Sequence, residues 1–250
     1  MFTPEDRERI RSELLEAARA DGRLSGGAIT GSAAAGREDA WSDIDLAFGV
    51  TEATRIPAVL ADWTSRMVDR HQALHHVDVV SGAWVYRVFL LANTLQVDLA
   101  FAPAAEFGAR APTFQLVFGN AADLKHAPPP SAESLIGFAW LYALHVRSAL
   151  ARGRLWQAEY MVSAVRDHVL ALACTRHGVP AREGRGMDQL PKEVTGPLAL
   201  ALVRSVDADE IARAFRVATE ALIREAGLVD RDLAARLAAT LQELSDWRNG

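Results

Sequence analysis

Three aspartates have the residue type and spacing to do chemistry together. Asp43 and Asp45 lie two residues apart, and Asp98 lies within the apolar run of residues 95–101. Residues two apart on a strand point to the same face, so Asp43 and Asp45 would project together and repel each other. A charge in a strand as apolar as the one around Asp98 is costly unless it is paired or bound to a metal. A divalent cation would remove both penalties, and ligands that are all oxygen suit Mg²⁺.

A glycine and a serine come before these acids. Gly31-Ser32 closes an expected strand at 26–31 and leads into small residues at 33–36. Glycine lets the backbone approach a ligand closely, and the free N–H groups of a short helical turn at this point would suit a phosphate. Three carboxylates beside such a cradle predict two-metal phosphoryl or nucleotidyl transfer. One ion would activate the attacking oxygen, and the other would neutralise the leaving pyrophosphate.

The sequence pattern also predicts the elements that position these residues. Thr3 caps a helix over residues 4–20, and a second helix covers residues 53–71. Strands are expected at 26–31, 43–50, 76–81, 84–91 and 95–102, with a turn at 92–94 that joins the last two into a hairpin.

The pattern changes after residue 127. The three prolines at 128–130 cannot sit inside a helix and predict a stiff linker. We therefore expect an α+β protein, in which residues 1–127 form a domain with a mixed, mostly antiparallel sheet flanked by helices and residues 131–250 form a helical bundle. The helices of the bundle are expected at 132–152, 155–177, 191–204, 208–226 and 230–247.

Composition excludes several classes of protein. Half of the 250 residues are hydrophobic and 24% are charged, which is ordinary for a globular chain. No apolar run approaches the roughly 18 residues that span a membrane, so we expect no membrane segment. The acidic start of the chain lacks the apolar stretch of a secretory signal, and Cys174 is the one cysteine. Both features favour the cytoplasm.

Charge narrows the range of partners. The formal net charge is −5, and Lys125 and Lys192 are the only lysines. Nucleic acid is therefore not the expected ligand, since proteins that bind a long duplex usually carry a basic surface. Residues 1–130 hold 12 basic and 17 acidic side chains, whereas residues 131–250 hold 15 of each. The acidic excess thus lies in the part that carries the three aspartates.

The order and spacing of these motifs resemble the DNA polymerase β-type nucleotidyltransferase superfamily. The resemblance is carried by Gly31-Ser32, ten intervening residues, Asp43-Ile44-Asp45, and Asp98 on a later strand. The run from Trp41 to Leu46 is close to the small bacterial members. A minimal nucleotidyltransferase domain followed by a helical bundle is similar to the antibiotic nucleotidyltransferases, such as the aminoglycoside and lincosamide adenylyltransferases.

The resemblance implies an enzyme that moves a nucleoside monophosphate, usually AMP from ATP, onto a hydroxyl group of a small molecule such as an antibiotic. It implies two Mg²⁺ ions, with Asp43 and Asp45 binding both and Asp98 binding the catalytic one. Gly31 and Ser32 would contact the nucleoside triphosphate.

One position departs from the family pattern. Many relatives have a basic residue where this chain has Ala35, and here Arg37 follows two positions later. Either Arg37 substitutes for that residue, or the charge comes from the helical bundle. There, an arginine cluster faces either the triphosphate or solvent; its members are Arg147, Arg152, Arg154 and Arg166.

The helix expected at 155–177 carries a candidate base. It is apolar almost all round, yet Glu159, Ser163 and Arg166 are spaced four and three apart and share one stripe. We predict that Glu159 takes the proton from the acceptor hydroxyl, with Asp167 as the second choice. Arg166 is the predicted ligand of the triphosphate from this domain. The alternative is a purely structural pair of Glu159 and Arg166.

Two other functions stay open. Minimal nucleotidyltransferases also serve in toxin–antitoxin pairs, where they modify or bind a protein partner, and an exposed apolar face on the bundle would favour that function. An RNA-tailing or tRNA-modifying enzyme would need a basic groove, which the net charge of −5 speaks against. By family analogy, a homodimer could complete the cleft.

Overall fold

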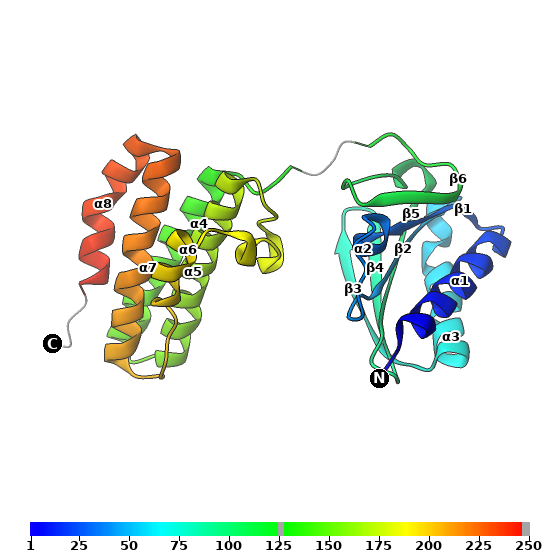
Figure 1. The fold of residues 1–250 in the computed structure, drawn as a ribbon, viewed down its shortest axis with the longest axis horizontal. Helices are drawn as coiled ribbons and strands as arrows, with labels where there is room; N and C mark the ends of the chain where they lie inside the picture. Colours follow the sequence, from blue (N-terminus) through cyan, green and yellow to red (C-terminus); the bar gives the residue numbers. More distant parts are fainter. Residues whose placement is uncertain (125–127, 247–250) are drawn as a thin grey trace. The chain divides into compact units, whose positions relative to one another are not determined.

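Six strands form one open sheet in the first part of the chain, in the order β3-β4-β5-β2-β1-β6 (Figure 1). The computed structural model describes residues 1–124 and 128–246. β2 and β5 run parallel, and the other neighbouring pairs are antiparallel, so the expected mixed, mostly antiparallel sheet is confirmed. The strands are β1 (Leu24–Thr30), β2 (Ile44–Val50), β3 (Ala73–Ser81), β4 (Trp84–Leu91), β5 (Gln96–Pro103) and β6 (Phe114–Gly119).

The helices of this part follow the expected positions with one split. Thr3 caps the first helix, and its side chain accepts a hydrogen bond from Asp6 N. The helix expected at 53–71 is divided into a 3-10 turn and an α-helix, because a proline fits only the first turn of a helix. The helical segments are α1 (Pro4–Ala20), α2 (Gly31–Ala34), η1 (Ala53–Arg55), α3 (Ile56–His71) and η2 (Ala104–Glu106).

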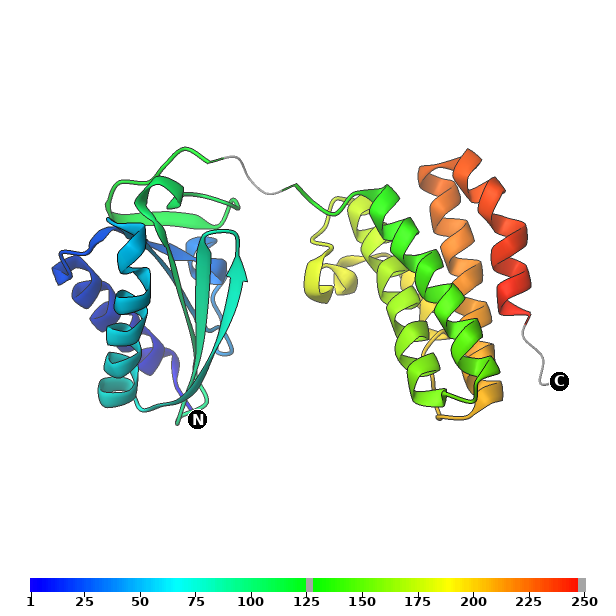
Figure 2. The same cartoon turned by 180° about the vertical axis from the view of Figure 1, so that it is seen from behind.

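Helices α1 and α3 cover one face of the sheet (Figure 2). Leu14 of α1 and Met67 of α3 are completely buried there. Three rings form an aromatic centre, with Trp63 lying 5.1 Å from Phe48 and 5.9 Å from Phe101 between ring centroids. Each such side chain contributes about 1.5–3 kcal/mol through its burial, so this face anchors the sheet.

The opposite face of the sheet is lined by small side chains. Ala28, Ala47 and Ala100 lie on it, with Trp84 and Phe107 packed near them. Side chains alternate between the two faces of a strand. The residues next to the large side chains buried under α1 and α3 therefore point to this alanine-lined face.

The strand β6 was not predicted from the sequence. It pairs antiparallel with β1 at the edge of the sheet, with a register shift between Gly27 and Ala28. Gln115 and Leu116 are exposed, so the strand lacks the continuous apolar pattern of the inner strands. Gly119 ends it with a φ of +76°.

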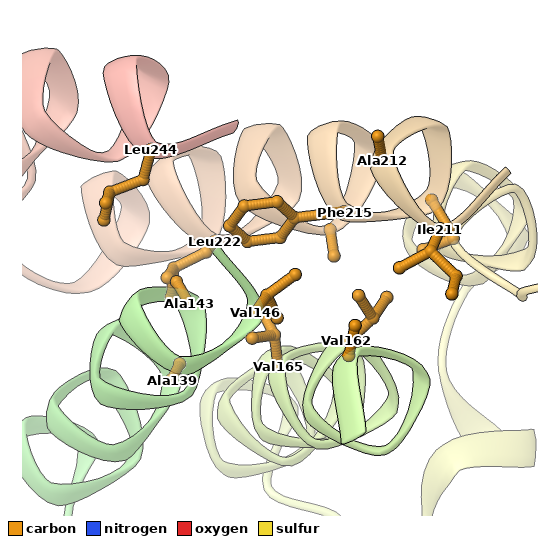
Figure 3. Packing of buried hydrophobic residues seen from close by; sticks show 14 of the residues in the cluster. Ala139, Ala143, Val146, Val162, Val165, Ile211, Ala212, Phe215, Leu222 and Leu244 are labelled. Atoms are coloured by element: carbon orange, nitrogen blue, oxygen red, sulfur yellow. The ribbon is translucent and has the colours of Figure 1, made fainter. Parts of the chain in front are cut away.

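Residues 128–246 form a bundle of helices around a core of their own. Figure 3 shows Phe215 of α7 lying among Val146 of α4 and Val165 of α5, and all three side chains are fully buried. Cys174 of α5 is buried in a separate small cluster with Leu190, and this burial raises the pKa of its thiol. The segments are α4 (Ala132–Ala151), α5 (Leu155–His177), η3 (Arg182–Gly184), η4 (Met187–Gln189), α6 (Lys192–Ala199), α7 (Ala208–Val229) and α8 (Arg231–Ser245).

Two helices of the bundle are shorter than expected. The helix predicted at 191–204 ends at Ala199, because Arg213 donates hydrogen bonds to the carbonyl oxygens of Leu200 at 2.6 Å and Leu202 at 3.0 Å. An arginine thus satisfies carbonyls that a longer helix would have used. The helix predicted at 230–247 ends at Ser245, and residue 247 lies outside the described residues.

The uninterrupted apolar run of α4 covers only residues 135–144, but the whole helix passes a test of length and mean composition. Its 20 residues are long and apolar enough to cross a membrane by length and composition. In this protein α4 is packed against other helices of the bundle, with Ala139, Ala143 and Val146 fully buried in the shared core. A core helix of a bundle passes the same test of composition.

The contacts divide the chain into two units, residues 1–127 and 128–250, and each unit has its own buried core. The expected domain end at residue 127 lies outside the described residues. We predict that residues 1–127 and residues 128–250, expressed separately, each fold, because every core cluster of the described residues is built within one unit. Circular dichroism with urea titration checks this. A cooperative transition in each fragment is expected, and loss of structure in either one would contradict the division.

Candidate active site

The structure brings Asp43, Asp45 and Asp98 together at one end of the parallel strand pair. Asp45 on β2 lies directly opposite Asp98 on β5, and Asp43 immediately precedes β2. Each aspartate offers one carboxylate oxygen, and these three oxygens all lie within 4.8 Å of one another. All three side chains are partly exposed. The three acids singled out in the sequence therefore form one cluster of oxygen ligands.

Burial on the other face of the sheet determines where the acids point. Ile44 and Leu46 flank Asp45 and are buried beneath α1 and α3, and Val97 is buried in the same way beside Asp98. Because side chains alternate, the acids project to the opposite face, which is lined by alanines. A slip of one residue would turn the carboxylates into the core, so the apolar neighbours hold the register.

Gly31 provides the space that the Asp45 carboxylate occupies. Its φ of +62° lies in the left-handed region that favours glycine. A Cβ atom at this position would overlap the carboxylate and lie 2.6 Å from Asp45 Cγ. Both the backbone conformation and this close approach require glycine at position 31.

Gly31 is the first residue of the short helix α2. Ser32 Oγ is buried and has no hydrogen-bond partner in the part of the chain that the structure describes. Buried polar atoms rarely stay without a partner, so this hydroxyl marks a place where a ligand group could bind. Arg37 N donates to Ser32 O at 3.0 Å and closes the turn, and the Arg37 side chain is exposed.

Two buried arginines of α1 hold the loop that leads into β2. Arg7 Nη1 donates to the carbonyl oxygens of Asp39 at 2.6 Å and Ser42 at 3.1 Å. Arg11 Nη1 donates to Glu38 Oε1 at 2.6 Å. Arg7 Nε lies 3.2 Å from the same oxygen, as an ion pair without hydrogen-bond geometry. These contacts therefore fix the backbone of the loop as far as Ser42, the residue before the first aspartate of the cluster.

The same loop is also held by its own side chains. Asp39 Oδ1 accepts hydrogen bonds from Trp41 N at 2.9 Å and Ser42 Oγ at 3.1 Å. These bonds favour the charged carboxylate and lower the pKa of Asp39 below its usual value. The Trp41 ring is 78% exposed, so the loop displays an aromatic surface two residues before Asp43.

Gln96 belongs to this site, although the sequence pattern did not single it out. Its Nε2 donates one hydrogen bond to Asp98 Oδ1 at 3.0 Å and a second to Asp43 Oδ2 at 3.3 Å. The signal was present, because Gln96 precedes Asp98 by two residues and therefore shares its face of the strand.

The second unit holds the other predicted site residues, and it is described by itself. Ser163 Oγ donates to Glu159 Oε1 at 2.8 Å, and Arg166 Nη1 lies 3.4 Å from Ser163 Oγ. Arg166 Nη2 forms an ion pair with Asp167 Oδ1 at 2.8 Å. The expected stripe is present on α5, but the ion pair of Arg166 recorded among the described residues is with Asp167 rather than with Glu159.

The helix α5 is less enclosed than its apolar sequence suggests. Trp156 is 76% exposed and Tyr160 is 67% exposed, so two aromatic rings lie on the surface on either side of Glu159 in the sequence. The helix is therefore apolar almost all round, as expected, but only part of that apolar surface is buried.

Comparisons with known proteins give a distant likeness. No protein-family model and no curated protein matches this chain. Among solved structures, the chain is similar to an aminoglycoside 6-adenyltransferase from Bacillus subtilis, with 12% sequence identity and a TM-score of 0.43 over 99% of this chain and 100% of that one. At this identity and TM-score, the likeness by itself establishes neither a family nor an activity.

Substitution of Gly31 tests whether this glycine makes room for the Asp45 carboxylate. Gly31→Ala should weaken the binding of Mn²⁺ at least about tenfold, because the new methyl group displaces a ligand, and tenfold corresponds to about 1.4 kcal/mol. Gly36→Ala is the matched control, since Gly36 has the same φ of +62° and open space around it. Both variants should lose about 1–2 kcal/mol of stability from the strained backbone. Equal Mn²⁺ affinity in the two variants would contradict this role.

Substitution of Arg7 tests the contact between α1 and the loop. Arg7→Met should lower the free energy of unfolding by about 2–3 kcal/mol, because it removes charged donors from two backbone carbonyls and keeps the apolar stem. Arg9→Met on the same helix should leave stability unchanged, since that side chain is exposed. Urea denaturation of both variants measures the difference, and equal midpoints would show that the contact contributes nothing.

Proposed function

We propose that this chain is a Mg²⁺-dependent nucleotidyltransferase, which transfers a nucleoside monophosphate, AMP from ATP, to a hydroxyl group of a small molecule. The observation that carries this proposal is the cluster of Asp43, Asp45 and Asp98 on adjacent parallel strands, with Gly31 pressed against one of its carboxylates. This cluster differs from a solvated group of surface acids, because its carboxylates are fixed in position. The register of two buried strands and a glycine with positive φ hold them there.

The chemistry of these ligands fits Mg²⁺. All three are carboxylates, which are the hard oxygen ligands that this ion prefers, and their partial exposure leaves room for phosphate oxygens to complete the coordination. Asp43 and Asp45 would hold two ions, and Asp98 would hold one of them. When bound, the ions would supply the positive charge that activates the attacking oxygen and stabilises the leaving pyrophosphate.

The turn after β1 would bind the triphosphate. Gly31 lets the backbone come close, and the unpartnered Ser32 hydroxyl can donate to a phosphate oxygen. The exposed guanidinium of Arg37 follows the same turn and would neutralise the pyrophosphate as it leaves. In this proposal Arg37 takes the place of the basic residue that relatives have at the position of Ala35.

The second unit would supply the base. The acceptor oxygen attacks the α-phosphorus, the bond from phosphorus to pyrophosphate breaks, and Glu159 takes the proton of the acceptor hydroxyl. Ser163 Oγ would orient this carboxylate through its hydrogen bond. Asp167 remains the second choice and is less suited, because it is already paired with Arg166. Arg166 would bind the triphosphate by exchanging that pair for phosphate oxygens.

The acceptor that fits best is a cationic molecule with several hydroxyl groups, such as an aminoglycoside. The acidic excess lies in the unit with the three aspartates, where residues 1–130 hold 17 acidic against 12 basic side chains. A cationic acceptor would be attracted to it. The name of the similar Bacillus subtilis protein points to the same class.

One observation favours a second candidate function, that of a nucleotidyltransferase with a protein partner. The bundle exposes large apolar side chains, among them Trp156 and Tyr160 of α5 and Phe138 and Leu144 of α4. Exposed apolar groups of this size are typical of protein-binding surfaces. Label from ATP would then be transferred to a protein that co-purifies with the chain, and no antibiotic would accept it.

The transfer reaction tests both candidates. ATP labelled at the α-phosphate, with Mg²⁺, should label an aminoglycoside or another small hydroxylated acceptor in the presence of wild-type protein. Asp43→Asn and Asp45→Asn should each lower the rate by on the order of 1,000-fold, because each removes a metal-binding charge. Both variants should stay folded, and the loss of repulsion should leave stability equal or higher.

The control for these variants is Asp69→Asn, which removes an exposed carboxylate from α3. Its transfer rate should equal that of the wild type. Full activity in either Asp43→Asn or Asp45→Asn would contradict the metal assignment. Activity lost in both, with label found on a protein rather than on a small molecule, would favour the second candidate.

A further inference from the structure

Four side chains, rather than three, lie together at the ends of the parallel strand pair. The ladder places Ile44 opposite Val97 and Asp45 opposite Asp98. One residue earlier along each of the two paired segments, Asp43 lies beside Gln96. Three corners of this square are carboxylates, and the fourth is a neutral amide.

The amide of Gln96 bridges two of the acids. Nε2 lies 3.0 Å from Asp98 Oδ1 and 3.3 Å from Asp43 Oδ2, and it donates a hydrogen bond to each. Carboxylates only accept hydrogen bonds, so the nitrogen rather than the oxygen of the amide must face them. The bridge therefore offsets part of the repulsion between these two acids.

The position of this nitrogen conflicts with a bound cation. Mg²⁺ prefers carboxylate oxygens, so an ion held by Asp43 and Asp98 would compete with the amide for the oxygens to which it donates. Gln96 is exposed, which lets its side chain turn into solvent when an ion arrives. A neutral amide leaves the negative charge of the acids intact, whereas a lysine would cancel part of it.

We propose that Gln96 is a placeholder for the divalent cation: its amide holds Asp43 and Asp98 together before an ion binds and leaves them when the ion binds. This inference rests on the proposed metal-binding role of the three aspartates. Gln96 is a positioning residue in this account, because it acts through the carboxylates. Before an ion binds, the two hydrogen bonds of Gln96 keep Asp43 and Asp98 at their spacing. The ion must displace these bonds when it binds, which lowers the affinity of the site for the ion.

The test is a titration of the full chain with Mn²⁺ alone, followed by electron paramagnetic resonance. Gln96→Leu should bind Mn²⁺ about tenfold more tightly than the wild type, because the empty site loses its two bridging hydrogen bonds while the loaded site loses nothing. Gln96→Lys should bind Mn²⁺ at least about tenfold more weakly, because its ammonium group pairs with the acids. Thermal unfolding without metal should show a lower midpoint for Gln96→Leu than for the wild type.

The matched control is Gln115→Leu on β6. Gln115 is an exposed strand glutamine and lies opposite Ile29, which packs on the helix-covered face of the sheet. The affinity of Gln115→Leu for Mn²⁺ should equal that of the wild type. Unchanged or weaker binding by Gln96→Leu, or undiminished binding by Gln96→Lys, would overturn the placeholder role.

The titration also separates this inference from the proposed function. Binding by the wild type that disappears in Asp43→Asn but is unchanged in Gln96→Leu would leave the metal site standing and overturn only the role of Gln96. Absence of Mn²⁺ binding in the wild type and in all variants would overturn both. Neither result depends on knowing the acceptor or the nucleotide.

Discussion

The repulsion among three carboxylates is the constraint on which the rest of this site depends. Asp45 and Asp98 are forced side by side because β2 and β5 are parallel and in register, and Asp43 joins them on the same face. Ligand oxygens within 4.8 Å of one another destabilise the protein unless a cation or a donor offsets their charge. The apolar neighbours of these acids, buried under α1 and α3, supply the free energy that holds the register against this repulsion.

Three surrounding residues help to position the carboxylates against this repulsion. Gly31 leaves space for the Asp45 carboxylate where any side chain would displace it. Arg7 holds the loop before Asp43 through two backbone carbonyls, so the first acid is placed by the N-terminal helix as well as by its strand. Gln96 donates to two of the acids from the neighbouring strand. The carboxylates are thus held at a spacing that suits a bound ion, and Gln96 is the group that we propose moves when the ion binds.

The sequence predicts the parts of this protein that depend on local pattern. The three aspartates and Gly31 could be found because alternation and the conformational freedom of glycine act over a few residues. The contacts of Arg7 were beyond such prediction, since they join residues 32 and 35 positions apart and a charged residue on a helix usually faces solvent. The edge strand β6 was missed because its residues are half-buried or exposed. The exposure of the outer face of α5 was missed because its aromatic side chains look like core residues in the sequence. Gln96 could have been found from its spacing to Asp98.

The central claim is that Asp43, Asp45 and Asp98 bind divalent cations that in turn hold a nucleoside triphosphate. A calorimetric titration of the full chain with ATP, first with Mg²⁺ and then with EDTA, tests it most directly when the wild type and Asp43→Asn are compared. We expect the wild type to bind ATP only when Mg²⁺ is present, and we expect Asp43→Asn not to bind it. Binding of equal strength with EDTA, or in Asp43→Asn, would contradict it.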